Sequence, residues 1–542
     1  MFPLHRSRTT DTTPELTASR HSAGARRTPR ECRRAQENAL QRLSTALKSC
    51  IVQLPFPSTQ APDPRLAAYY RDYDLRFRAH LPSYFVPGDG LWEIPLWVAH
   101  LTALIDTARL DSSFCDLSKE PAEPDACAEP ILADTAPGDL VLMSPLAQNL
   151  KLALEVSATL QRAGRRVVLG GNMAPLVPAG SVHMVHRGQL DASFVTRLVE
   201  MAAGEGGQSE KAPTLGLSPH RVSWSPNYRH LEGYRGSVPM LRLNASHGCL
   251  YKCSFCGDAW SKQLTLVTKD ALAEEVDQLA ARFPDTRLVY IGDKTFGQSR
   301  EAVQNLLDVF RDRPGYRFIV QTHVMQVKEW VVDAMHQLGV IAVEMGFESA
   351  DTQVMKRHHK LSRGLDDYTE KIRTVSDSGL KVVLNVMGGL DEETEAAHRQ
   401  TVQWLDDNSA WLWLFNLYNF VPYPLTPDFP RLRRRIVDWD FAAWREDAPV
   451  VYRPQHLSRE RSWELFQEKI AVAHRIVRGC PTESTGEERE SGPAGAVPSS
   501  PTVSPARCDE PAAGLLRPAT ERQARGLRAR PASGWSGIAT LF

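Results

Sequence analysis

Between residues 241 and 427 the chain repeats one pattern six times: a short apolar run, a glycine-rich or polar phrase, and a stretch with helical spacing. Short apolar runs bounded by turn residues are typical of buried strands, and a period near 3.6 is typical of helices. Strands that alternate with helices form a parallel sheet, so an α/β fold is predicted. In barrels of such units, the loops after the strands hold the chemistry. The expected strands are Leu241–Asn244, Arg287–Ile291, Tyr316–Val320, Ile341–Met345, Lys381–Val386 and Trp411–Asn419.

The loop after the first expected strand carries three cysteines, Cys249, Cys253 and Cys256, in the spacing C-x3-C-x2-C. Three thiolates on so short a loop can converge on one metal centre, and soft thiolates favour iron–sulfur clusters, zinc or copper(I). Clusters of four irons ordinarily take four cysteines, so three leave one metal corner open. An open position suits catalysis, whereas a structural zinc site needs a fourth protein ligand, for which His247 is a candidate.

The spacing of the cysteines, with Phe255 before the last one and Lys252 inside the loop, resembles the signature loop of the radical S-adenosylmethionine (SAM) superfamily. The strand-end phrases MGFESAD, VMGGLDEET and FVPYPLTP are similar to phrases of the same family. The resemblance implies a partial (β/α)6 TIM-type barrel and a [4Fe-4S] cluster whose open iron chelates SAM. An electron delivered by a partner such as flavodoxin or ferredoxin would then cleave SAM to give a radical.

The resemblance also places SAM contacts at the strand ends. The predicted SAM-binding residues are Phe255, Gly257, Gly292, Asp293, Gln321, Glu348, Met387 and Gly388. His323 is a further residue that could reach the SAM ribose or the substrate. Structural alternatives stand beside these roles: an acid such as Asp293 can cap a helix, His323 can be a satisfied barrel histidine, and Glu348 can be salt-bridged.

Ahead of the barrel, the apolar runs Leu140–Met143 and Arg166–Leu169 flank a stretch of helical spacing from Gln148 to Ala163. A second parallel sheet is therefore expected, and parallel sheets bind ligands at the carboxyl ends of their strands. Ser144, Gly170 and Gly171 would lie at that edge.

The phrase VVLGGNMAPLVPAG, followed by VHRG, resembles the cobalamin-binding domain that precedes many radical SAM barrels. The resemblance implies cobalamin beside Ser144, Gly170 and Gly171. However, the family motif D-x-H-x-x-G, whose histidine ligates cobalt, is absent, and residues 110–125 contain no histidine. Cobalamin binding therefore stays open, because a tight strand-to-helix turn also explains two adjacent glycines.

Shifts in composition suggest the organisation of the chain. The expected parts are a disordered basic arm (1–35), a helical lead-in (36–79) with an amphipathic helix over Glu37–Leu54, a cobalamin-binding-like α/β domain (80–215), a linker (216–238), the radical SAM barrel (239–430), a C-terminal helical extension (431–479) with a helix over Trp463–Val477, and a disordered tail (480–542).

Lys and Arg together number 64, as do Asp and Glu, so no global charge favours nucleic acid as a partner. No stretch approaches the roughly 20 apolar residues of a membrane helix. Nine cysteines in 542 residues do not form a disulfide framework, which fits a reduced, cytoplasmic setting. These observations favour a small-molecule substrate.

The leading interpretation is an enzyme that cleaves SAM and alkylates, in the first place methylates, an unactivated centre of a small-molecule or natural-product intermediate. A second interpretation is a radical SAM enzyme with a vestigial cobalamin domain, which performs a rearrangement, a ring closure or 3-amino-3-carboxypropyl transfer. A third, of another class, is a non-catalytic binding protein stabilised by zinc.

Overall fold

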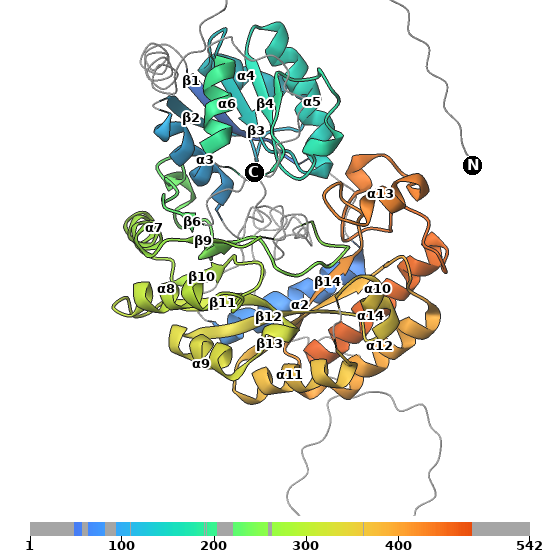
Figure 1. Cartoon of the computed structure of the whole chain (residues 1–542). Helices are drawn as coiled ribbons and strands as arrows, with labels where there is room; N and C mark the ends of the chain where they lie inside the picture. Colours follow the sequence, from blue (N-terminus) through green and yellow to red (C-terminus); the bar gives the residue numbers. More distant parts are fainter. Residues whose placement is uncertain are drawn as a thin grey trace, which may run out of the picture.

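The computed structural model describes residues 48–56, 63–81, 94–108, 110–188, 190, 192–202, 221–257, 263–360 and 363–479. Two parallel sheets lie one above the other in Figure 1, each covered by helices. The predicted arm (1–35) and tail (480–542) lie outside the described residues, as does most of the polar stretch before residue 221.

The upper sheet has five strands in the order β2-β1-β3-β4-β5, all of them parallel. The strands are β1 (Lys48–Gln53), β2 (Asp111–Asp116), β3 (Leu140–Met143), β4 (Arg166–Leu169) and β5 (Met184–Val185). The associated helices are α3 (Leu96–Thr107), α4 (Pro124–Asp134), α5 (Ala147–Arg162) and α6 (Ala192–Ala202). This is a doubly wound order, and ligands bind such sheets where the strand order reverses, here between β1 and β3.

The expected helix over Glu37–Leu54 is wrong in its described part, because residues 48–53 form β1 at the centre of the sheet. Cys50, Ile51 and Val52 are consecutive and fully buried, as in a strand covered on both faces. A short apolar run does not separate such a strand from a buried helix by periodicity, and pairing with β2 and β3 decides the outcome. The sheet thus begins well before residue 80, where the α/β domain was expected to start.

The lower sheet confirms the predicted partial barrel. Its six strands follow the chain in the parallel order β14-β13-β12-β11-β10-β7. They are β7 (Leu241–Leu243), β10 (Leu288–Ile291), β11 (Arg317–His323), β12 (Val340–Glu348), β13 (Lys381–Gly388) and β14 (Leu414–Asn419). Five outer helices are α7 (Lys269–Arg282), α8 (Arg300–Phe310), α9 (Glu329–Leu338), α11 (Leu365–Asp377) and α12 (Glu395–Asp407).

Local sequence signals set the ends of these helices. The helices α7, α8 and α12 begin after Thr268, Ser299 and Thr394. In each case the side-chain hydroxyl accepts a hydrogen bond from the backbone amide three residues later. Gly339, at a φ of 84°, ends α9 in the left-handed conformation that glycine adopts without strain. Strands β11 and β12 run three residues further than predicted, so His323 and Glu348 end strands rather than follow them.

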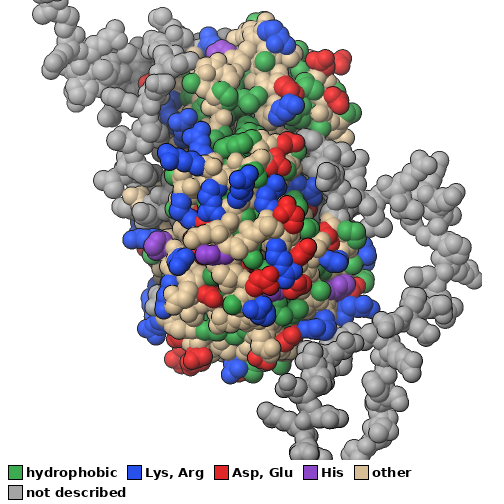
Figure 2. Space-filling model, turned by 90° about the vertical axis from the view of Figure 1, so that its right-hand side faces the viewer, with side chains coloured by type: hydrophobic (Ala, Val, Ile, Leu, Met, Phe, Trp, Pro, Cys, Tyr) green, Lys and Arg blue, Asp and Glu red, His purple; other side chains and the backbone are tan. Residues whose placement is uncertain are grey.

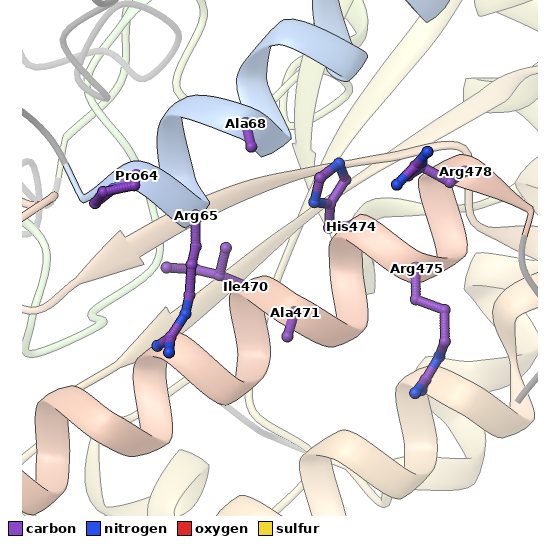
Figure 3. Close-up of a pocket in the computed structure, with 8 residues that line it drawn as sticks. All are labelled: Pro64, Arg65, Ala68, Ile470, Ala471, His474, Arg475 and Arg478. Carbon is purple, nitrogen blue, oxygen red and sulfur yellow. The ribbon is translucent and has the colours of Figure 1, made fainter. Parts of the chain in front are cut away.

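The edge strand β14 is covered by two helices from opposite ends of the chain. These are α2 (Pro64–His80) and α14 (Arg459–Arg478), which pack on each other (Figure 3). The hydroxyl of Tyr69 on α2 donates to the carbonyl of Phe415 at 2.6 Å and accepts from its amide at 2.9 Å. One side chain therefore satisfies backbone groups that an edge strand leaves unpaired.

The upper sheet and the carboxyl ends of the lower strands share one apolar core. Val141 of β3 and Val167 of β4 belong to the same buried cluster as Met387, Phe420 and Trp444. The barrel mouth is therefore closed over by the upper unit on this side. Within the described residues, no helix is long and apolar enough to cross a membrane.

Candidate active site

The three cysteines lie on the loop that follows β7 and the short strand β8 (Ser246–His247), at the carboxyl end of the barrel. Cys253 is buried, whereas Cys249 and Cys256 are half-buried. Gly248 precedes the first cysteine at a φ of 88°, a conformation that favours glycine. Burial raises the pKa of the Cys253 thiol to about 11, and the nearby ammonium of Lys360 opposes this rise.

Two side chains from the loop after β10, the buried Asp293 and the half-buried Gln298, hold the entry to the cysteine loop. The carboxylate of Asp293 accepts from the amides of Ala245 at 2.7 Å and Ser246 at 3.0 Å. Burial raises the pKa of Asp293 to about 6, although these hydrogen bonds favour its charged form. The side chain of Gln298 accepts from Leu250 N at 3.2 Å and donates to Gly248 O at 3.1 Å.

At the adjoining turn, a Cβ on Gly292 would lie 2.1 Å from Asn244 Oδ1 and 2.7 Å from Arg242 Nε. The turn therefore requires glycine because side chains of β7 and its continuation fill the space. Asp293 and Gly292 both have structural functions here, and their contact with SAM stays a prediction.

A buried polar cluster clamps the middle of the cysteine loop. Ser254 N donates to His358 O at 2.9 Å, and Ser254 Oγ lies 2.9 Å from His358 Nδ1 and 2.8 Å from Asp428 Oδ2. His358 Nε2 lies 2.9 Å from Glu392 Oε2, and the His358 side chain is 1% exposed. Burial alone would lower the pKa of His358, but its bonds to Asp428 and Glu392 raise it to about 9. His358 is therefore a buried cation at neutral pH.

Arginines of the C-terminal segment complete this cluster. Arg431 contacts Glu392 at 3.3 Å, Asp428 at 3.1 Å and the fully buried Asp391, while Arg435 reaches Asp391 at 2.8 Å. Sequence reasoning missed this cluster. No local spacing could have revealed it, because His358 and Asp428 are 70 residues apart.

Glu348, at the end of β12, is buried in an ion pair with Lys360, whose Nζ lies 3.2 Å from its Oε1. Burial raises the pKa of Glu348, and Lys360 counters the rise. The backbone of Glu348 has a φ of 67°, where a non-glycine residue is strained, and the pairing of β12 with β13 shifts register there. Such strain clusters at functional sites. The salt-bridged alternative is therefore observed, while a role for Glu348 toward SAM stays a prediction.

His323, at the end of β11, stacks on Tyr251 of the cysteine loop, with ring centroids 3.7 Å apart and planes within 3°. Its Nδ1 accepts from Met325 N at 3.1 Å, so the ring proton lies on Nε2. Burial and the charge of Lys360 lower the pKa of His323 well below its ordinary value, so the ring is neutral. The neighbouring Gln321 accepts from Tyr290 OH at 3.0 Å inside the barrel.

The end of β13 is shaped by α14. The buried Lys469 donates to Met387 O at 2.7 Å and forms an ion pair with Glu393. A Cβ on Gly388 would lie 2.5 Å from Phe466 Cδ2, so the glycine lets α14 approach the strand. The predicted closeness of this backbone to adenine remains a prediction, and the structure supplies another reason for the glycine.

The remaining predicted residue pair, Phe255 and Gly257, flanks Cys256. The Phe255 ring lies edge-on to His358, with centroids 5.6 Å apart, and is partly buried. A Cβ on Gly257 would meet nothing within 4 Å, so crowding does not require glycine there.

Ser144, Gly170 and Gly171 follow β3 and β4 at the carboxyl edge of the upper sheet, and their contact with cobalamin stays a prediction. Gly170 N donates to Met143 O at 3.0 Å, which joins the two strand ends, and Gly171 has a φ of 85°. Ser144 is half-buried beside them. Asn172 follows, and its Oδ1 is buried without a hydrogen-bond partner among the described residues. A donor group of a bound ligand would satisfy this atom, since native proteins leave few buried polar atoms without a partner.

Among the described residues, no three His, Cys, Asp or Glu side chains gather closely enough to hold a single metal ion. The three cysteines share one loop but are not drawn together around one point. His247, the candidate fourth zinc ligand, packs edge-on to His100 at 5.8 Å, and burial lowers its pKa to about 4.

Comparison with known proteins gives relatives of one kind. Residues 243–405 match the model of the radical SAM superfamily. The bacteriochlorophyllide d C-12(1)-methyltransferase of Chlorobaculum tepidum is 21% identical over 387 residues, which cover 69% of this chain and 82% of that protein. The hopanoid C-2 methylase of Rhodopseudomonas palustris is 22% identical over 256 residues, which cover 43% of this chain and 48% of that protein.

Two solved structures share the fold. The radical SAM methyltransferase TsrM of Kitasatospora setae, with cobalamin and a [4Fe-4S] cluster bound, superposes with a TM-score of 0.53 at 14% identity, over 72% of this chain and 75% of that one. The cobalamin-dependent radical SAM enzyme OxsB, with aqua-cobalamin bound, gives 0.50 at 14% identity, over 71% of this chain and 54% of that one. Residues 243–405 therefore form a radical SAM domain, and the chain shares the fold of solved cobalamin-dependent radical SAM enzymes.

Proposed function

We propose that this enzyme holds a [4Fe-4S] cluster on Cys249, Cys253 and Cys256, cleaves SAM, and methylates an unactivated centre of a small molecule. The observation that carries the proposal is the position of the cysteine loop. It lies at the mouth of the six-stranded barrel, and that mouth packs against a doubly wound sheet of the cobalamin-binding type. That both curated relatives are methylating enzymes supports methyl transfer in particular.

The residues fit the proposed groups. Three cysteines on a clamped loop, with no fourth side chain gathered beside them in the described structure, suit a cluster with one open iron. When bound, the cluster supplies the electron for SAM cleavage, and cobalamin supplies the methyl carrier. Radical chemistry of this kind belongs to the cofactors, while the protein supplies position and electrostatics.

Several residues of the chain would position SAM beside the loop. Phe255 offers an aromatic face next to the last cysteine, and Glu348 brings a carboxylate whose charge Lys360 balances. His323 is neutral and keeps its proton on Nε2. The barrel mouth thus combines an ion pair with a neutral ring, so these side chains add no net charge beside the proposed SAM site. We assign these residues to SAM or substrate contact.

For cobalamin, Ser144, Gly170 and Gly171 would line the approach and Asn172 Oδ1 would accept from an amide of the ligand. The absence of the cobalt-ligating histidine means that no protein imidazole from residues 110–125 would bind the metal. The same absence keeps the vestigial-domain interpretation as a second candidate. In it, SAM cleavage would serve a rearrangement, a ring closure or 3-amino-3-carboxypropyl transfer.

The test is anaerobic reconstitution with iron, sulfide and hydroxocobalamin, followed by metal analysis and an assay for SAM fragments. About four irons per chain with near-stoichiometric cobalt, and a labelled methyl group in the product, support the proposal. Four irons without cobalt refute methyl transfer through cobalamin and favour the second candidate. Zinc in place of iron refutes both. As a control, C253A should lose iron while C127A, which alters a buried thiol of α4, should keep it.

A further inference from the structure

A group of exposed cations, which we call the basic rim, lies on the cysteine loop and on the two segments that hydrogen-bond to it. The basic rim consists of Lys252, Lys356, Arg357, Arg431, Arg433 and Arg434. Lys252 lies in the cysteine loop itself, and Lys356 and Arg357 end α10 (Thr352–Arg357), directly before His358. The arginines belong to α13 (Phe429–Leu432) and the turn after it. Figure 2 shows Lys and Arg side chains gathered across the middle of the face that carries α10 and α13 at the right of Figure 1.

Short contacts join this rim to the loop. Ser254, between two of the cysteines, donates to Asp428 Oδ2 at 2.8 Å, and Asp428 Oδ1 lies 3.1 Å from Arg431 Nη2. On the other side, Ser254 N bonds the carbonyl of His358, the residue after Arg357. The two segments that carry most of the basic rim are therefore held directly against the cysteine loop.

Most of the rim's charge is uncompensated. Arg431 is neutralised by the acids beneath it. By contrast, Lys252, Lys356, Arg357, Arg433 and Arg434 form no ion pair with any residue that the structure describes. Three exposed large apolar residues, Leu250, Val437 and Trp439, lie on the same segments as these cations. Uncompensated charge of one sign suits a partner of the opposite charge, which it attracts over a distance.

We propose that the basic rim is the docking surface for an acidic one-electron donor protein that reduces the cluster. The inference rests on the proposed function, because reductive cleavage of each SAM consumes one electron. In the encounter the donor loses one electron and the cluster gains it, and no proton or group is transferred. Complementary charge steers such partners together and raises their association rate, which falls as salt screens the charges.

The test uses the full, reconstituted chain and two reductants. A reduced acidic flavodoxin is the probe for docking, and a photoreduced, uncharged deazaflavin bypasses any docking surface. The variant R433E/R434E reverses two rim charges that hold no part of the His358 cluster. The matched control R65E/R71E makes the same charge change on α2, where Arg65 lines the groove against α14 (Figure 3). The readout is the second-order rate of cluster reduction, followed by loss of the cluster's visible absorbance.

At low salt, R433E/R434E should reduce the flavodoxin rate by about tenfold or more, the scale of electrostatic steering. The difference should shrink at about 1 M salt, where screening acts within roughly 3 Å. The deazaflavin rate should stay equal for all three proteins, and R65E/R71E should match the unmodified chain with flavodoxin.

Equal flavodoxin rates for all three proteins would overturn the proposal, and so would a loss confined to R65E/R71E. Binding to phosphatidylserine vesicles that R433E/R434E abolishes, with flavodoxin rates unchanged, would reassign the rim to a lipid surface. Failure of the proposed function is distinguishable, because the deazaflavin-reduced cluster would then not cleave SAM, whatever the flavodoxin rates.

Discussion

Replacing His358 by glutamine should destabilise the protein strongly at pH 6 and much less at pH 9.5. The folded state raises the pKa of His358 from an ordinary 6.5 to about 9. A rise of about 2.5 units corresponds to about 3 kcal/mol, at roughly 1.4 kcal/mol per unit. Because the folded pKa is the higher one, this stability is fully present below pH 6.5 and is lost as pH rises through about 9.

The measurement is urea unfolding of the anaerobic apo chain, followed by circular dichroism, for the unmodified protein and H358Q at both pH values. The difference between the two proteins at pH 6, minus their difference at pH 9.5, isolates the histidine. Other groups that titrate in this interval, such as Glu275 with a pKa that burial raises to about 8, are common to both proteins and cancel. We expect this double difference to be about 3 kcal/mol.

A double difference near zero would refute the reasoning, since it would mean that His358 is neutral in the folded protein. The matched control is H336Q, which makes the same substitution in the last turn of α9. Among the described residues, His336 forms no ion pair with an acid. In the reconstituted protein, H358Q should also lower the iron content, because Ser254 of the cysteine loop loses its contact with the His358 ring.

Three further predictions concern the helices around the barrel. G388A should destabilise the protein by about 1–3 kcal/mol because the new methyl meets Phe466, and F466A should relieve part of this cost in the double variant, as thermal unfolding would show. K469M should cost about 3–5 kcal/mol in urea because it leaves Glu393 buried without its cation, whereas K469M/E393L should recover most of the loss. Y69F should cost about 1–3 kcal/mol and speed amide exchange in β14, and unchanged exchange there would contradict the edge-capping function of the hydroxyl.

Sequence reasoning succeeded where the information is local. The strands at 288–291 and 381–388 are short apolar runs before glycine, and helix starts at Thr268 or Ser299 follow from hydroxyl caps. The cysteine loop could be recognised because its ligands are all within eight residues. Such features depend on neighbours in the chain, which the sequence displays directly.

Sequence reasoning failed where contacts between distant segments determine the structure. Residues 48–53 form a strand because β2 and β3 flank them, and nothing within the segment records those partners. Lys360 and Lys469 are buried, against the strong tendency of lysine to be exposed, because acids from other loops meet them. The His358 cluster likewise joins four loops. Each site residue can therefore be proposed from its motif, but the contacts that hold it in place come from distant segments of the chain.

The position of α2 ties the two units of the enzyme together. The chain leaves the upper sheet after β1, lays α2 against the barrel, and returns to the upper sheet through α3 and β2. Tyr69 is synthesised 346 residues before Phe415, the β14 residue with which its hydroxyl forms hydrogen bonds. During synthesis, the aromatic face of α2 therefore stays uncovered until nearly all of the barrel has been synthesised. The upper unit is therefore not a separable domain. Any single truncation that removes it also removes α2, which covers the edge of the barrel, so we expect neither unit to fold completely without the other.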